Sequence, residues 1–88
     1  MVRILSMNEE NFLNKRLEDV IRKTFQLSES GIEENWTSVD IPKWDSVGHL
    51  NLIVEIEKTF QVTMEMDEMF EIETLGDIQK ILKRKQAL

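Results

Sequence analysis

The stretch from Trp44 to Phe60 constrains the fold more strongly than any other part of this chain. It opens on Asp45-Ser46, two residue types that are preferred immediately before a helix. The apolar positions that follow are Leu50, Leu52, Ile53, Val54, Ile56 and Phe60. At about 100° per residue they cover an arc wider than one packing face requires. We therefore predict a central helix that begins at Asp45 or Ser46, ends near Phe60 and packs against several neighbours.

The remaining narrow face of this helix is expected to face solvent. It collects Gly48, Asn51, Glu55, Lys58 and Thr59, while His49 and Glu57 interrupt the apolar arc. His49 is the only histidine, and no G-x-S-x-G nucleophile elbow is present. A Ser-His-Asp hydrolase is therefore not predicted, and His49 is interpreted as a polar residue on the rim of the helix.

Three further segments carry helical patterns. Ser6-Met7-Asn8-Glu9 has the spacing of a capping box, and apolar residues then recur every three or four positions, which predicts a helix from about Asn8 to Gln26. Residues 66–72 are predicted to form a short helix. Its acidic residues lie near the start, where the helix dipole favours negative charge. Thr74 is a cap candidate for a last helix that continues to Lys85.

Residues 27–44 show no sustained period and are predicted to form a long ordered loop. Such loops are uncommon and often functional. Because its apolar residues are too many to leave in water, we expect the loop to lie across the helices. These residues are Ile32, Trp36, Val39, Ile41 and Trp44. The core between the helices is predicted to include Leu52, Ile53, Ile56, Met64, Met66, Met69 and Phe70.

Length and composition limit the fold and the partners. The 88 residues suit one domain over residues 1–88, and strand-like alternation is absent, so we predict an all-α four-helix bundle with a short third helix. Without cysteine, the chain has no thiolate metal ligand, and any thiol chemistry needs a cofactor. The net charge of -6 argues against nucleic acid. The absence of a long apolar run argues against a membrane span or signal peptide, which suggests a cytoplasmic monomer.

The segment Asp45-Ser46-Val47 through Leu50 and Leu52 to Glu57-Lys58-Thr59-Phe60 resembles the Asp-Ser-Leu helix of acyl carrier proteins. Members of that family are small helical bundles whose motif serine carries 4′-phosphopantetheine, and the thiol of this arm holds an acyl group as a thioester. The resemblance implies Ser46 as the attachment site. Val47 stands where leucine is usual, and Pro42-Lys43-Trp44 replaces the common glycine before the Asp-Ser pair.

The resemblance implies a free-standing carrier without catalytic activity of its own. A phosphopantetheinyl transferase would modify Ser46, and Asp45 would either cap the helix or help hold the transferase's magnesium and coenzyme A. Enzymes that load and process the acyl group would then use the thioester, in fatty acid, polyketide or a more specialised biosynthesis. Two alternatives remain open: a carrier of aminoacyl or peptidyl groups, and an unmodified helical interaction domain whose Asp-Ser pair is only a cap.

Acidic residues dominate the second half of the chain. Residues 45–77 contain nine acids and one base, Lys58. A solvated face is the simpler interpretation, but such a surface also suits weak, fast contacts with basic patches on partner enzymes. The candidate partner-binding residues are Val47, Glu55, Glu57, Asp67 and Glu68. No spacing of an EF-hand type accompanies these acids, so a metal site is not predicted.

Overall fold

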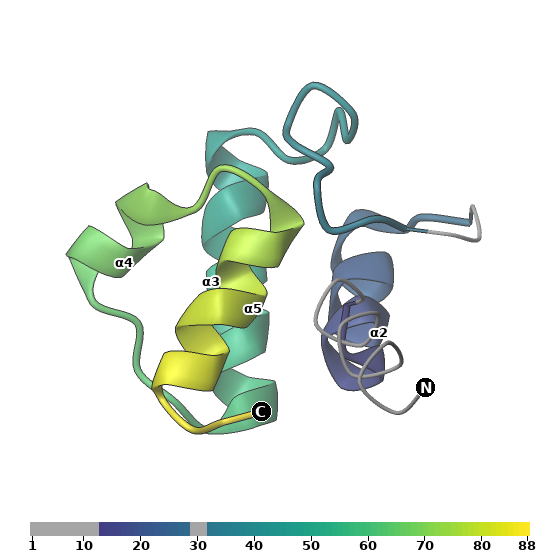
Figure 1. The fold of residues 1–88 in the computed structure, drawn as a ribbon. Coiled ribbons are helices and arrows are strands. Elements are labelled where there is room, and N and C mark those ends of the chain that lie inside the picture. Colours follow the sequence, from purple (N-terminus) through teal and green to yellow (C-terminus); the bar gives the residue numbers. More distant parts are fainter. Residues whose placement is uncertain (1–12, 29–31) are drawn as a thin grey trace.

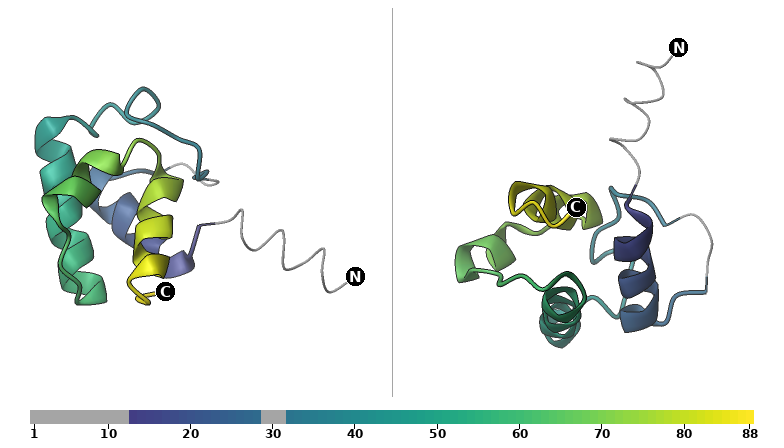
Figure 2. Two further views of the ribbon diagram at one scale, coloured as in Figure 1. Left: turned by 60° about the vertical axis from the view of Figure 1, so that its left-hand side comes forward. Right: turned by 90° about the horizontal axis from the view of Figure 1, so that it is seen from below.

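The structure is a computed structural model that describes residues 13–28 and 32–88. These residues hold α2 (Lys15–Phe25), α3 (Ser46–Phe60), α4 (Met66–Glu71) and α5 (Leu75–Arg84), and no strand lies among them. In Figure 1, α2 runs opposite to α3, whereas α5 runs in the same direction as α3. The short α4 lies to one side and connects the end of α3 to the start of α5 (Figures 1 and 2). The arrangement confirms the predicted all-α class with a short helix before the last one.

The first described helix begins later than the sequence suggests. Leu13 and Asn14 are not helical, and the Asn14 side chain accepts hydrogen bonds from the N–H groups of Arg16 and Leu17 as the N-cap of α2. The predicted continuous helix from Asn8 is therefore wrong at these residues, because a capping side chain competes with helical continuation. The proposed capping box at Ser6–Glu9 lies outside the described residues.

The loop before α3 packs against the bundle, as expected, at the end where α3 and α5 begin (Figure 1). Ile32, Ile41 and Trp44 are buried, and two of the loop's carbonyl groups accept hydrogen bonds from the first turn of α5. The N–H of Leu75 donates to Trp36 O at 3.1 Å, and the N–H of Gly76 donates to Glu34 O at 2.7 Å. The loop thereby satisfies donors that a helix start leaves unpaired. Val39 was predicted to be buried but is 88% exposed.

The start of α5 is fixed by a capping box. Thr74 Oγ1 accepts from the N–H of Asp77, and the Asp77 carboxylate accepts from the N–H groups of Glu73 and Thr74. Burial alone would raise the pKa of the Asp77 carboxyl, but these backbone donors outweigh it and lower the pKa below its ordinary value. The predicted cap at Thr74 is confirmed.

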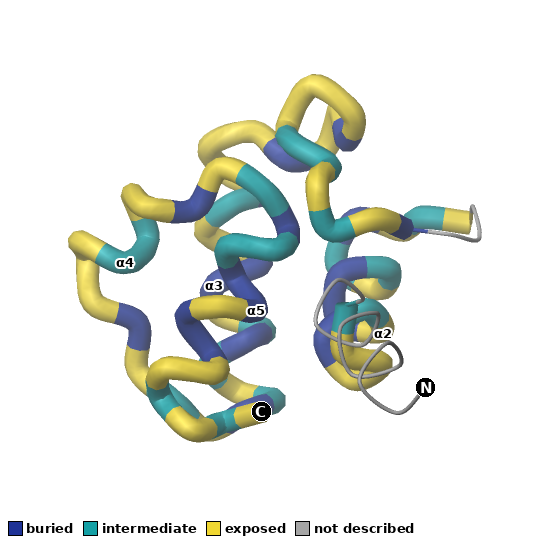
Figure 3. Tube along the Cα trace, in the orientation of Figure 1, coloured by how far each residue is buried: buried dark blue, intermediate teal, exposed yellow. Residues whose placement is uncertain are grey.

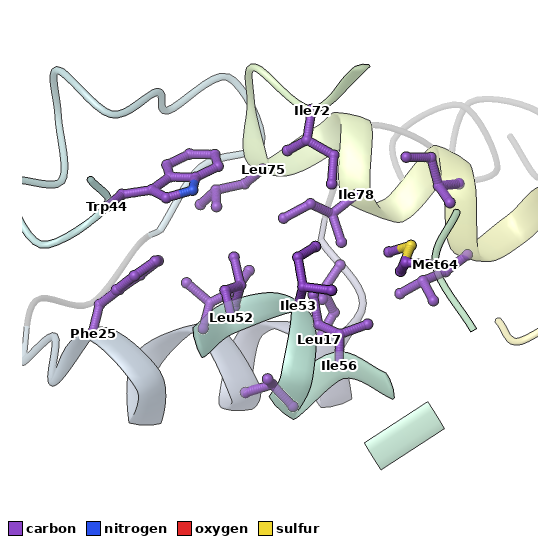
Figure 4. Packing of buried hydrophobic residues seen from close by; sticks show 14 of the residues in the cluster. Leu17, Phe25, Trp44, Leu52, Ile53, Ile56, Met64, Ile72, Leu75 and Ile78 are labelled. Carbon is purple, nitrogen blue, oxygen red and sulfur yellow. The ribbon is translucent and has the colours of Figure 1, made fainter. Parts of the chain in front are cut away.

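The hydrophobic core lies between α2, α3 and α5, and all three helices carry buried residues, which are dark blue in Figure 3. Figure 4 shows Leu17, Leu52, Ile53, Ile56 and Ile78 meeting there. The prediction that Met66 and Phe70 belong to this core is wrong: they are 67% and 80% exposed, and α4 contributes no fully buried residue. No helix of the described residues has the length and apolar character needed to cross a lipid bilayer.

The central helix α3 is covered on fewer sides than predicted. Leu52, Ile53, Ile56 and Phe60 are buried, but Leu50 and Val54 are 59% and 48% exposed. Gly48 differs from its prediction in the other direction: it is predicted to face solvent, but it is buried. The wide apolar arc therefore combines a core-facing side with an exposed apolar strip of Val47, Leu50 and Val54.

Candidate functional site

Ser46 is the first residue of α3, and its side chain is available for chemistry. The residue is exposed, and its hydroxyl makes no hydrogen bond to the described part of the chain. Val47 beside it is 67% exposed. A hydroxyl in this position can be reached from outside without unfolding any part of the helix.

Asp45 caps α3 and fixes the backbone around Ser46. Its Oδ1 accepts a hydrogen bond from the N–H of Gly48 at 2.8 Å, and its carbonyl accepts from the N–H of His49 at 2.7 Å. The N–H groups of Ser46 and Val47 have no acceptor within the described residues. Two unpaired donors at the positive end of a helix favour an anion, so a phosphodiester on Ser46 fits this position.

Gly48 allows the preceding loop to come unusually close to α3. A Cβ atom added at Gly48 would lie 1.9 Å from the carbonyl oxygen of Lys43 and 3.2 Å from the Phe25 ring. No side chain fits at that distance, so only glycine lets residues 43–45 fold back against the first turn. This contact sets the direction in which Trp44 enters the core.

Trp44 and His49 join the loop, α3 and α4 through two hydrogen bonds. The indole N–H of Trp44 donates to His49 Nδ1 at 2.9 Å, and His49 Nε2 lies 3.1 Å from Met69 O. Because an indole can only donate, Nδ1 must accept, and the proton on Nε2 is then donated to the carbonyl. The Trp44 and His49 rings lie edge to edge, with their planes inclined by 26° and their centroids 6.1 Å apart. We call this arrangement the His49 bridge.

A recess of about 610 Å³ opens beside Ser46. Its lining comes from the loop, from the start of α3 and from the end of α4. The residues are Thr37, Ser38, Val39, Trp44, Asp45, Ser46, His49, Met69, Phe70, Ile72 and Glu73. Trp44 forms the inner wall and itself contacts Phe25 at a centroid distance of 6.1 Å (Figure 4). The recess thus places a concave surface next to a free hydroxyl.

The four acidic partner-binding candidates differ in their own contacts. Glu57 accepts a hydrogen bond from the N–H of Met64 at 2.8 Å. Glu68 pairs with Lys85 at 2.8 Å, and the hydrogen bond from this ammonium, helped by the Glu65 N–H, lowers the pKa of the Glu68 carboxyl. Glu55 pairs loosely with Lys58 at 3.7 Å, and Asp67 is exposed. Glu55 and Asp67 therefore offer the more accessible carboxylates.

Sequence reasoning singled out Ser46, Asp45 and the acidic surroundings as candidates, but it missed the His49 bridge and the role of Gly48. His49 follows Ser46 by three residues and so shares a side of the helix with it. Nothing in that spacing indicates that Trp44 turns back to meet the ring. Among the described residues, no three His, Asp or Glu side chains are grouped so as to hold a metal ion.

The sequence matches a family model described as a phosphopantetheine attachment site over residues 44–82. It is 30% identical to an acyl carrier protein from Lactobacillus acidophilus over 81 residues, which cover 92% of this chain and all of the relative. Ser46 is the only serine within the matched residues 44–82.

Two solved structures have a similar fold. The solution structure of the holo acyl carrier protein from Geobacter metallireducens gives a TM-score of 0.75 at 26% identity, with 82% of this chain and 83% of that chain covered. A candidate acyl carrier protein from Mycobacterium tuberculosis gives a TM-score of 0.71 at 25% identity, with 78% and 92% covered. The likeness therefore extends over most of the chain.

Proposed function

The chain belongs to the acyl carrier protein family, and we propose that its covalently attached 4′-phosphopantetheine is carried on Ser46. The observation that carries the proposal is that the only serine of the matched residues 44–82 is also an exposed, unpaired hydroxyl at the start of α3. As a member of this family, the protein is a carrier and not a catalyst. The role of the fold is to present the phosphopantetheine arm to other enzymes.

The modification is a transfer from coenzyme A by a separate phosphopantetheinyl transferase. Ser46 Oγ attacks the phosphorus that bears the pantetheine group, and the P–O bond to the second phosphate breaks. Adenosine 3′,5′-bisphosphate leaves, and the hydroxyl proton passes to a base of the transferase. The new phosphodiester then lies beside the N–H groups of Ser46 and Val47, which favour its charge.

We expect the wild-type protein to gain the mass of one phosphopantetheine when incubated with coenzyme A, Mg²⁺ and a broad-specificity transferase. Ser46→Ala should gain none, because it lacks the attacking oxygen. Ser38→Ala is the matched control, since Ser38 is also an exposed hydroxyl lining the recess, and it should be modified like the wild type. Intact-mass spectrometry decides the outcome, and modification of Ser46→Ala would refute the proposal.

Asp45→Asn separates the two roles proposed for Asp45. Asparagine is as good an N-cap as aspartate, so the start of α3 should be retained. If Asp45 helps hold the transferase's magnesium and coenzyme A, the loading rate of this variant falls while its free energy of unfolding stays the same. An unchanged loading rate would leave Asp45 with the capping role alone.

We further propose that acyl-loading and acyl-processing enzymes in the cytoplasm recognise the exposed strip of Val47, Leu50 and Val54 together with the acids around it. Glu55 and Asp67 are accessible enough to meet Lys and Arg side chains of a partner. Glu57 and Glu68 also make contacts within the protein itself. Removing either carboxylate would therefore change the stability of the fold as well as any contact with a partner. The replacement of the family's common glycine by Pro42-Lys43-Trp44, together with the His49 bridge built from Trp44, supports a specialised pathway.

Asp67→Asn should slow loading by the transferase at low ionic strength by roughly two- to five-fold, the equivalent of about 0.5–1 kcal/mol for one exposed charge. The difference should disappear at high salt, because surface charges are screened. The urea midpoint of Asp67→Asn should match that of the wild type, whereas Glu68→Gln should lower it through loss of the Lys85 pair. Equal loading rates for wild type and Asp67→Asn at low salt would remove Asp67 from the partner surface.

A further inference from the structure

The His49 bridge ties the start of α3 to α4 at the recess beside Ser46. His49 projects from the first turn of α3, and its Nε2 reaches Met69 O on α4 at 3.1 Å. Its other ring nitrogen accepts a hydrogen bond from the Trp44 indole, which lies edge to edge with the imidazole. Both hydrogen bonds must break before the ring can move aside. The bridge is therefore a closed side wall between the recess and the core.

The core behind this wall is filled by the protein's own side chains. Leu52, Ile56 and Ile78 are 0% exposed, and Ile53 and Met64 are 2% and 3% exposed. Protein interiors are close-packed, so an alkyl chain can enter only if several of these residues move apart. The recess, in contrast, already exists and is rimmed by the strongly exposed Val39 and Phe70.

The charged residues that line the recess also favour some acyl groups over others. Its lining residues include the carboxylates of Asp45 and Glu73 and contain no lysine or arginine. Both nitrogen atoms of His49 are occupied in the neutral bridge. A carboxylate on the bound group would meet two like charges, whereas an ammonium or hydroxyl group would find acceptors.

We propose that the His49 bridge makes this protein a carrier of short, uncharged or cationic acyl groups, held in the recess beside Ser46, and excludes long alkyl chains from the bundle. The inference rests on the proposed attachment at Ser46. The thioester of a short cargo would then stay at the surface, accessible to partner enzymes without a prior opening of the bundle. Trp44 and His49 act as specificity-determining residues through the wall that they form.

The test starts with the transferase loading acetyl-, decanoyl-, β-alanyl- or malonyl-phosphopantetheine from the corresponding coenzyme A thioester. Intact mass is measured first, and absence of loading contradicts the attachment at Ser46. The later measurements are made on loaded protein and test only the bridge and the recess. Amide signals are then compared with those of the thiol form. In the wild type, the decanoyl group should leave the amide signals of Leu52, Ile56 and Met64 unchanged. Shifts of these core signals in the wild type would overturn the proposal.

His49→Ala removes the wall and should admit the decanoyl chain, so that the core amide signals shift and hydroxylaminolysis of the thioester slows several-fold. Trp44→Phe removes the donor to His49 Nδ1, together with part of the buried indole, and provides a second variant if His49→Ala does not fold. Asn51→Ala, an exposed position on the same helix, should behave like the wild type. If both bridge variants fold and still keep the decanoyl chain outside, the bridge is not the determinant.

A separate comparison tests the preference for uncharged or cationic acyl groups. The β-alanyl and malonyl groups are similar in length but opposite in charge. We expect the β-alanyl group to shift the amide signals of Val39, Phe70 and Glu73, which line the recess, and the malonyl group to leave them as in the thiol form. Equal shifts with both groups would overturn the selectivity for uncharged or cationic cargo.

Discussion

Gly48→Ala should lower the free energy of unfolding by about 3 kcal/mol or more, at the upper end of what overpacking costs. The added Cβ would lie 1.9 Å from Lys43 O, so the backbone of the loop or of α3 must move. The Phe25 ring, 3.2 Å from the added Cβ, also limits this movement. The urea midpoint measured by circular dichroism checks the result, since the midpoint follows stability when the slope is unchanged.

Gly76→Ala is the matched control for this substitution. Gly76 also lies in the first turn of a helix against a loop, but its added Cβ would come no closer than 3.2 Å to its nearest neighbours, Glu34 Cβ and O. A small shift relieves that contact, and alanine gains about 0.8–1.0 kcal/mol over glycine in a helix. The net change at Gly76 should be within about 1 kcal/mol. Equal losses at Gly48 and Gly76 would contradict the close approach of Lys43 to α3.

Leu52→Ala should cost about 2–5 kcal/mol, the usual range for a buried leucine. Leu52 is 0% exposed and lies among Leu17, Ile53 and Ile56 in the core (Figure 4). The substitution removes its transfer energy and leaves a cavity that α2 and α5 can close only in part. The same urea titration measures the change.

Leu50→Ala makes the same chemical change two residues earlier on the same helix. Leu50 is 59% exposed, so its loss should cost less than about 1 kcal/mol, as most surface substitutions do. The contrast tests the orientation of α3 directly. A loss at Leu50 as large as that at Leu52 would mean that α3 is rotated so that Leu50 is buried as well.

The helices themselves could be predicted because their causes are local. Caps at Asp45 and Thr74 and the spacing of apolar residues determine where α3 and α5 begin. Which part of an apolar arc is covered depends on neighbours that the pattern does not specify. Leu50 and Phe70 are exposed for that reason, and α2 begins only at Lys15 because Asn14 caps it, which the spacing of the apolar residues does not indicate.

The candidate site could be predicted only in part. Ser46 follows from a motif that is contiguous in the sequence. The His49 bridge requires Trp44, His49 and Met69 to meet across three segments, which only the folded chain brings together. Gly48 likewise looks like an exposed helix residue until the path of Lys43 is known.

The most direct test of the account is to locate the arm after loading with coenzyme A. Cleavage after Lys43 and Lys58 releases a peptide from Trp44 to Lys58, in which Ser46 is the only residue with a hydroxyl side chain. We predict that this peptide, and no other, carries the mass of one phosphopantetheine. Recovery of the unmodified 44–58 peptide from fully loaded protein, with the added mass on the 24–43 peptide that contains Ser38, would contradict the central claim.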